Sequence, residues 1–137
     1  MEYAGANNPI YLIRNVDSGK VNESLKPFLT DKNENFELFE IKSDKQPIGY
    51  FDVRKNYQNN VIDIQKGDTI YLFSDGFADQ FGGSKGKKYK YAQFKKLLLD
   101  IQNQSFEEQR GALKESFDTW KMQFEQVDDV CIIGLRI

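Results

Sequence analysis

The chain has 137 residues, enough for one domain with a buried core, and a formal net charge of −2, which argues against a partner that needs a strongly basic surface, such as nucleic acid. Its single cysteine, Cys131, cannot form an internal disulfide, and this fits a reducing cytoplasm. The absence of histidine excludes a Ser-His-Asp triad and a His-ligated zinc site, so a bound metal would need oxygen ligands, as Mg²⁺, Mn²⁺ and Ca²⁺ prefer.

The first elements in chain order are predicted to be short strands. Residues 10–15 (IYLIRN) form one, and the Asn-Asn-Pro before them is typical of a hairpin turn from a strand that ends at Tyr3 and Ala4. Residues 16–35 are polar and aperiodic, which predicts a surface loop. Residues 36–41 (FELFEI) contain an alternating pattern and predict a further strand.

The middle of the chain predicts a hairpin. Residues 61–65 (VIDIQ) and 69–74 (TIYLFS) are separated by a Lys-Gly-Asp turn. The second of these strands is almost entirely apolar, so we expect it in the middle of a sheet with both faces covered. Its apolar run stops at Ser74-Asp75-Gly76, where burial of a carboxylate would be costly.

Two amphipathic helices and a final strand follow. The first helix carries an apolar stripe at helical spacing: Phe94, Leu97, Leu98 and Ile101. Ser105 to Glu108 match a capping box, and the second helix carries a stripe of Leu113, Phe117, Trp120 and Phe124, of which Phe117 and Trp120 are expected in the core. The final strand (DDVCIIGLRI, 128–137) contains Cys131, which is expected to be buried and inert. This order predicts an α+β domain with helices packed on antiparallel strands.

Two aspartate sites flank the apolar strands. Asp75 ends one strand, and Asp128 and Asp129 begin another. If these strands are antiparallel neighbours, the carboxylates gather at one end of the sheet, which is unfavourable unless a divalent cation binds them. Gly76 would let a metal-bound water or a substrate approach the backbone. Ser-Asp-Gly is also an ordinary turn, and Asp-Asp often lies in a solvated loop, so spacing alone leaves both interpretations open.

Four segments in order carry a family resemblance: YAGANNPIYLIR, QPIGY, GDTIYLFSDGFADQ and VDDVCIIGLRI. They are similar to motifs of the protein phosphatase 2C superfamily, and more narrowly of the branch typified by the stage II sporulation protein E phosphatase domain. The turn that commonly reads Ala-Gly-His-Asn-Pro in that branch has lost its histidine here. Cys131 stands where threonine is common.

The resemblance implies a partial phosphatase-2C-like β-sandwich flanked by helices, with residues 1–137 forming the C-terminal portion of a single domain whose N-terminal part is absent. It implies hydrolysis of phosphoserine or phosphothreonine by an activated water at two Mn²⁺ or Mg²⁺ ions. Asp75 and Asp128 match the metal ligands of the motifs, and Gly76 and Asp129 match supporting positions. Because the family's N-terminal half supplies further acidic ligands, the chain alone is expected to be inactive.

The resemblance also implies partners. These are a phosphorylated protein substrate, with an anti-sigma-factor antagonist as one candidate, and an upstream sensory or receiver region in the cytoplasm. The alternative function is a catalytically silent protein-interaction domain with the same fold. No apolar stretch approaches the ~20 residues that span a bilayer, so no membrane contact is expected.

Residues 82–91 (GGSKGKKYKY) interleave four lysines with two tyrosines. A solvated loop at a helix start is one interpretation, and nucleic-acid binding is another. A third is that Lys85, Lys87 and Lys88 contact the substrate phosphate. We expect no nucleic-acid partner.

Self-association is expected as well. Loss of half a sandwich would leave bare apolar sheet surface and unpaired strand edges, which a second chain could cover. The alternative is that the helices and residues 16–35 cover that surface instead.

Overall fold

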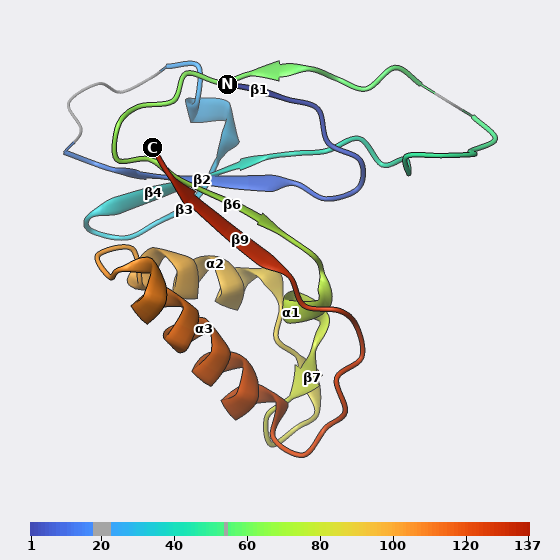
Figure 1. Ribbon diagram of the computed structural model, residues 1–137, viewed down its shortest axis with the longest axis vertical. Helices are drawn as coiled ribbons and strands as arrows, with labels where there is room; N and C mark the ends of the chain where they lie inside the picture. Colours follow the sequence, from blue (N-terminus) through green and yellow to red (C-terminus); the bar gives the residue numbers. More distant parts are fainter. Residues whose placement is uncertain (18–22, 54) are drawn as a thin grey trace.

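A five-stranded antiparallel sheet organises the computed structural model, which describes residues 1–17, 23–53 and 55–137 (Figure 1). Its strand order is β3-β4-β2-β6-β9. The strands are β2 (Ile10–Asn15), β3 (Leu29–Lys32), β4 (Phe36–Ile41), β6 (Thr69–Phe73) and β9 (Ile132–Arg136). Helices α2 (Tyr91–Asp100) and α3 (Phe106–Lys121) lie on one side of this sheet, which we call the helix face (Figure 1).

The strand register fixes which ends of the strands meet. Ile10, the first residue of β2, lies opposite Ile41 at the end of β4 and opposite Leu72 near the end of β6. Phe73 at the end of β6 lies opposite Ile132 at the start of β9. The chain therefore leaves β4 and β6, and enters β2 and β9, at the same end of the sheet.

Alternating side chains of the strands build two separate cores. On the helix face, Tyr11 and Ile13 of β2 and Tyr71 and Phe73 of β6 pack with aromatic and aliphatic residues of α2 and α3. The opposite, outer face carries a second cluster: Ile10, Leu12, Leu25, Phe39, Ile41, Ile62 and Ile70. Period-2 alternation along β2 explains why neighbours such as Tyr11 and Leu12 belong to different cores.

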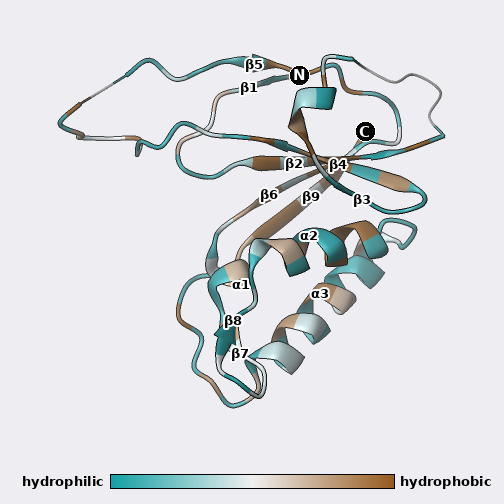
Figure 2. Ribbon diagram, turned by 180° about the vertical axis from the view of Figure 1, so that it is seen from behind, coloured by the Kyte–Doolittle hydropathy of each residue, from teal (hydrophilic) through white to brown (hydrophobic). Residues whose placement is uncertain are grey.

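The outer face is covered over only part of the sheet (Figure 2). A two-stranded sheet of β1 (Glu2–Tyr3) and β5 (Asn60–Val61), together with the 3-10 turn η1 (Lys26–Phe28), supplies residues that pack on β2 and β4. Over β6 and β9, by contrast, Leu72 is 45% exposed, Ile133 56% and Leu135 54%. We call these three side chains the outer strip.

A buried ion pair between Arg14, near the end of β2, and Asp68, directly before β6, lies at one end of the sheet. The Arg14 guanidinium donates through Nε to Asp68 Oδ1 at 2.8 Å and through Nη2 to Asp68 Oδ2 at 2.6 Å. Nη2 also donates to the Asp63 carbonyl, and the Gln65 amide donates to Asp68 Oδ2. Both charged side chains are buried, so this pairing offsets the cost of removing them from water.

Short elements follow β6 that the sequence did not predict. Helix α1 (Gly76–Asp79) begins directly after Asp75, and β7 (Phe81–Gly82) pairs with β8 (Lys87–Lys88). Phe77 and Ala78 of α1 are buried, which holds this turn against the helix-face core. Lys87 and Lys88 therefore lie in a hairpin rather than in an open loop.

Two predicted hairpins are wrong. β1 pairs with β5 rather than with β2, because Asn7 adopts a positive φ of 61° and its amide bonds to the Asp44 carbonyl, which turns the chain away. Residues 61–65 do not pair with 69–74; β6 pairs with β2 and β9 instead. The predicted loop 16–35 contains η1 and β3 within its described part, while residues 18–22 of it lie outside the described residues.

Several other predictions are confirmed. β6 lies inside the sheet, α2 and α3 are present, and Ser105 and Glu108 form the capping box. Helix α3 ends at Lys121, however, so Phe124 lies beyond the helix whose apolar stripe it was predicted to join. Phe117 is in the helix-face core, with Trp120 packed against it.

The expectation that both faces of β6 are covered is wrong at Leu72, which is exposed on the outer face. Cys131 is exposed rather than buried, because it precedes β9 at the uncovered side of the sheet. Within the described ranges, no helix is long and apolar enough to cross a membrane.

Candidate functional site

Pairing of β6 with β9 brings the predicted acidic residues to one end of the sheet. The antiparallel register runs from Thr69 opposite Arg136 to Phe73 opposite Ile132. It continues beyond the strands, since the Ser74 amide donates to the Cys131 carbonyl at 3.0 Å. Asp75 thus follows β6 where Asp128 and Asp129 approach β9. We call this end the acidic end.

Ser74 fastens the two segments together. Its hydroxyl donates to the Asp129 carbonyl at 2.7 Å and accepts from the Cys131 amide at 2.9 Å. One side chain thereby satisfies two backbone groups on either side of Val130. In the sequence Ser74 indicates only a turn, because its hydrogen bonds reach a segment more than fifty residues away.

Gly76 is required by a close backbone approach. A Cβ at this position would lie 2.3 Å from the Asp129 carbonyl oxygen and 3.2 Å from that of Asp128. Any other residue would push the 128–129 segment away from the start of α1. The glycine therefore has a packing role between the two acidic segments.

The carboxylates themselves are exposed. Asp75 occupies the N-cap position of α1, but its side chain makes no capping hydrogen bond. The Asp128 carboxylate accepts from the Asp129 amide at 2.7 Å, which leaves its second oxygen outside that bond. Burial raises the pKa of the nearby Tyr91 hydroxyl, and the negative charges of Asp75, Asp79 and Glu40 raise it further.

The donor set fits part of a site for a hard divalent cation. Carboxylate oxygens are the ligands that Mn²⁺ and Mg²⁺ prefer, and two of them come from adjoining strand ends here. Within the described parts of the chain, however, no three acidic or cysteine side chains gather closely enough to hold a metal ion. Asp75 and Asp128 can therefore contribute to such a centre but do not complete one.

Gln80 anchors the segment that leads to Asp128. This fully buried side chain donates from Nε2 to the Phe81 carbonyl at 2.9 Å and to the Glu125 carbonyl at 2.8 Å. The Trp120 indole nitrogen donates to the Gln80 carbonyl at 3.1 Å. Gln80 thus ties the end of α1 to the chain that follows α3. A polar residue beside a buried turn is a weak signal, so the sequence alone did not predict this role.

The candidate phosphate-contacting lysines lie on the β7–β8 side of α1. Lys88 forms an ion pair with Asp79 at 3.0 Å and lies 5.9 Å from the centre of the Phe81 ring. Lys85 and Lys87 are exposed in the same hairpin. The structure thus brings Lys88 to α1, the helix that follows Asp75, with part of its charge already matched by Asp79.

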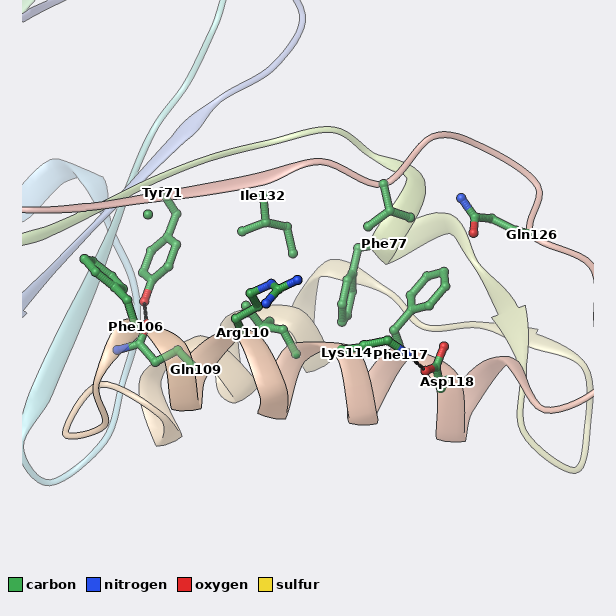
Figure 3. Close-up of a pocket in the computed structure, with 13 residues that line it drawn as sticks. Tyr71, Phe77, Phe106, Gln109, Arg110, Lys114, Phe117, Asp118, Gln126 and Ile132 are labelled. Carbon is green, nitrogen blue, oxygen red and sulfur yellow. Dashed lines mark hydrogen bonds and ion pairs between the residues drawn. The ribbon is translucent and has the colours of Figure 1, made fainter.

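A pocket lies away from the acidic carboxylates, between α3, β6 and residues 126–134 (Figure 3). Its volume is about 510 Å³. Figure 3 shows Arg110 reaching from α3 toward Ile132, with Phe106 on one side of it and Phe77 and Phe117 on the other. Asp75, Asp128 and Asp129 do not line it. This pocket therefore lies on the helix face, between α3 and the segment that leads into β9.

Comparisons with known proteins identify a family and a solved structure that resemble this chain. Residues 3–137 match the family profile described as Stage II sporulation protein E (SpoIIE). A solved chain described as the SiaA-PP2C domain of Pseudomonas aeruginosa is similar in structure, with a TM-score of 0.74 and 25% sequence identity. The similarity covers 99% of this chain and 45% of that one, so the chain spans less than half of the solved structure it resembles. No curated protein sequence matches the chain.

Proposed function

The chain belongs to the stage II sporulation protein E family and has a phosphatase-2C-type fold, and on this premise we propose that it is the C-terminal portion of a domain that hydrolyses phosphoserine or phosphothreonine in a protein partner. The observation that carries the proposal is the β6–β9 pairing, which joins the segments of Asp75 and Asp128 at the acidic end.

Asp75 and Asp128 would hold Mn²⁺ or Mg²⁺ through their carboxylate oxygens, with Gly76 and Asp129 as supporting residues. A two-metal centre supplies an activated water and neutralises charge on a phosphoryl group. The residues of this chain do the positioning. Ser74 ties Asp129 and Cys131 to the end of β6, and Gly76 permits the close contact between α1 and the 128–129 backbone.

Lys85, Lys87 and Lys88 would attract the substrate phosphate from the β7–β8 hairpin. Their exposure favours this role, because exposed ammonium groups raise the local concentration of a phosphorylated partner. The ion pair of Lys88 with Asp79 reduces its contribution, so Lys85 and Lys87 are the stronger candidates.

Under this proposal, the active site is incomplete in this chain. The outer strip is bare where a second sheet of a sandwich would pack, and a metal-binding trio is missing from the described residues. Both observations favour a domain whose remaining acidic ligands and strands come from another part of the parent protein. The isolated chain should then be inactive toward phosphopeptides.

The partners follow from the same premise. The substrate would be a phosphorylated signalling protein, with an anti-sigma-factor antagonist as one candidate, and the parent would carry a sensory or receiver region in the cytoplasm. A nucleic-acid partner is not proposed, because the lysines of residues 82–91 are accompanied by a net charge of −2 overall.

The second candidate function is a catalytically silent interaction domain. The lack of three convergent acidic or cysteine side chains among the described residues favours it. The two candidates differ in whether Asp75 and Asp128 bind a divalent ion at all.

Mn²⁺ titration of the chain, followed by paramagnetic broadening of its amide NMR signals, tests the proposal. Broadening should centre on residues 74–76 and 128–131 and should be lost in Asp75→Asn and in Asp128→Asn. Asp100→Asn, an exposed change on α2, is the matched control and should leave the broadening intact. Absence of site-specific broadening in the unmodified chain would mean that these two carboxylates do not bind the ion without further ligands, and its absence in the parent-length domain as well would favour the silent domain.

An activity assay on the parent-length domain separates the candidates further. Hydrolysis of p-nitrophenyl phosphate should require Mn²⁺ or Mg²⁺ and should fall by orders of magnitude in Asp75→Ala, because removal of a ligand leaves the ions misplaced. Full turnover by Asp75→Ala would contradict the assignment.

A further inference from the structure

Gln80 lies at a joint between three parts of the chain that are far apart in the sequence. It is the C-cap of α1, and its side chain is fully buried. Its backbone carbonyl accepts hydrogen bonds from the Tyr89 amide at 2.9 Å and from the Trp120 indole at 3.1 Å. Its side-chain nitrogen donates to the Glu125 carbonyl at 2.8 Å. The end of α1, the β7–β8 hairpin and the chain around the end of α3 therefore meet at this residue (Figure 1).

The orientation of the Gln80 carboxamide is set by its surroundings. Its nitrogen faces two carbonyl oxygens, those of Phe81 and Glu125, so the opposite orientation would bring three oxygens together. In the observed orientation Oε1 is buried and has no hydrogen-bond partner among the described residues. A buried acceptor without a partner costs stability and offsets the gain from the two donated bonds. Stability therefore gives only a weak reason for a glutamine at this position.

Hydrogen bonds hold the backbone on both sides of Asp128. On one side, the Ser74 hydroxyl donates to the Asp129 carbonyl at the end of β6. On the other side, the Gln80 side chain donates to the Glu125 carbonyl, three residues before Asp128. The short segment that carries the Asp128 carboxylate is thus fixed at both of its ends.

Helix α1 links the Gln80 contact to Asp75. Asp75 precedes α1 and Gln80 follows it, and the Asp79 amide donates to the Asp75 carbonyl at 2.9 Å. A helical turn fixes the separation of its ends, at about 1.5 Å per residue. Phe77 is buried in the helix-face core and holds this turn in place. The place of Gln80 relative to Asp75 is therefore set by α1, and Gln80 in turn sets the course of the chain before Asp128.

The last turn of α3 is fixed to the same joint. The Trp120 carbonyl accepts a hydrogen bond from the Gly83 amide at 2.8 Å, and a Cβ at Gly82 would lie 1.9 Å from that carbonyl oxygen. The β7–β8 hairpin therefore packs directly on the backbone of α3, which a glycine permits. The chain that leaves α3 thus starts from a fixed place and meets Gln80 at Glu125.

We propose that Gln80 is a positioning residue, whose side-chain amide sets where the Asp128 carboxylate lies relative to Asp75. In the proposed function these two carboxylates hold the metal ions, and the role of Gln80 rests on that premise. Replacing a residue that orients metal ligands without touching the metal commonly lowers metal affinity by about 10- to 100-fold. Gln80 acts in this way through the backbone carbonyl of Glu125 rather than through another side chain.

Gln80→Met tests this role, because methionine keeps the length of the side chain and removes the donor. Gln80→Leu gives a second variant in case methionine disturbs the packing. Gln102→Met is the matched control. Gln102 is also buried, and its side-chain nitrogen also donates twice, to the Tyr71 hydroxyl at 2.7 Å and to the Leu98 carbonyl at 2.8 Å. These contacts join α2 to β6 and do not reach the segment before Asp128.

The first measurement uses the chain without metal. Circular dichroism should show that the variants are folded. Heteronuclear NMR relaxation should show that the amides of residues 125–128 become mobile in Gln80→Met and stay ordered in Gln102→Met. The Cys131 amide, which is bonded to the Ser74 hydroxyl, should stay ordered in both. Unchanged order of residues 125–128 in both Gln80 variants would overturn the proposal, whether or not the metal binds.

The second measurement uses the parent-length domain and p-nitrophenyl phosphate. The Mn²⁺ concentration that gives half the maximal rate should rise by about 10- to 100-fold in Gln80→Met, with a smaller change in the rate at saturating Mn²⁺. Gln102→Met should leave that concentration unchanged. An equal rise in both variants would indicate a general loss of structure and would overturn the proposal. An unmodified domain that is inactive at every Mn²⁺ concentration would instead contradict the proposed function, and the relaxation measurement would still decide whether Gln80 holds the segment before Asp128.

Discussion

The two faces of the central sheet are built from the same strands but differ in how far they are covered. On the helix face, α2 and α3 bury Tyr71 and Phe73 of β6 almost completely. On the outer face, Ile70 is 4% exposed, whereas Leu72, two residues along the same strand and on the same side, is 45% exposed. The difference shows that burial of a strand residue depends on the layer above it more than on the strand's own composition.

The largest expected effect is on the closed face. Phe94 is fully buried and packs against the rings of Tyr11, Phe73 and Phe77. Phe94→Ala should lower the free energy of unfolding by about 3–5 kcal/mol, because it removes apolar contacts and leaves a cavity. Urea unfolding followed by circular dichroism measures this value. A loss below about 1 kcal/mol would mean that the helix face is not a tightly packed core.

Two variants on the outer face of β6, one at a buried and one at an exposed position, test whether coverage decides the contribution of a side chain to stability. Ile70→Ala should cost about 2–5 kcal/mol, whereas truncation at an exposed site such as Leu72→Ala should change stability by about 0.5 kcal/mol or less in a monomer. The two variants should be compared at a protein concentration low enough for the chain to be monomeric, so that self-association does not contribute. Equal losses at both positions would show that something covers the outer strip in solution.

A smaller effect is expected at the start of α3, where the capping box holds the helix. Ser105→Ala should destabilise the chain by about 1 kcal/mol, because the Glu108 amide loses its acceptor. Hydrogen bonds from the Ser105 hydroxyl and amide hold the pKa of the Glu108 carboxyl below its ordinary value. The variant should raise that pKa, which NMR titration of the Glu108 side chain can follow. An unchanged pKa would show that the hydroxyl does not contribute.

Local patterns predicted the helix face well. The capping box of Ser105 and Glu108, the stripe from Phe94 to Ile101 and the central place of residues 69–74 depend on neighbours in sequence, and all three are present. The family motifs identified the acidic end, and strand pairing places those segments together. That Asp75 and Asp128 bind a metal stays a prediction.

Long-range pairing is where prediction from sequence failed. Asn7 and Pro9 have turn chemistry, yet the turn directs β1 to β5 rather than to β2, since the competing bond from Asn7 to Asp44 depends on a residue far along the chain. Gln80 and Ser74 were missed for the same reason, because their partners lie 45 and 55 residues away. The exposure of Cys131 could not be read from an apolar strand sequence without knowing which layer was uncovered.

The β6–β9 register also has a consequence for the order of folding. It joins residues that are 59 apart at Phe73 and Ile132 and 67 apart at Thr69 and Arg136, whereas β2 and β4 join residues 21 to 31 apart. Closing a longer loop costs more chain entropy, and contacts of high sequence separation tend to form late. The β2–β4 ladder can therefore nucleate before the two acidic segments meet. The acidic end would be assembled in one of the last steps of folding, and its formation would report that the rest of the sheet is already in place.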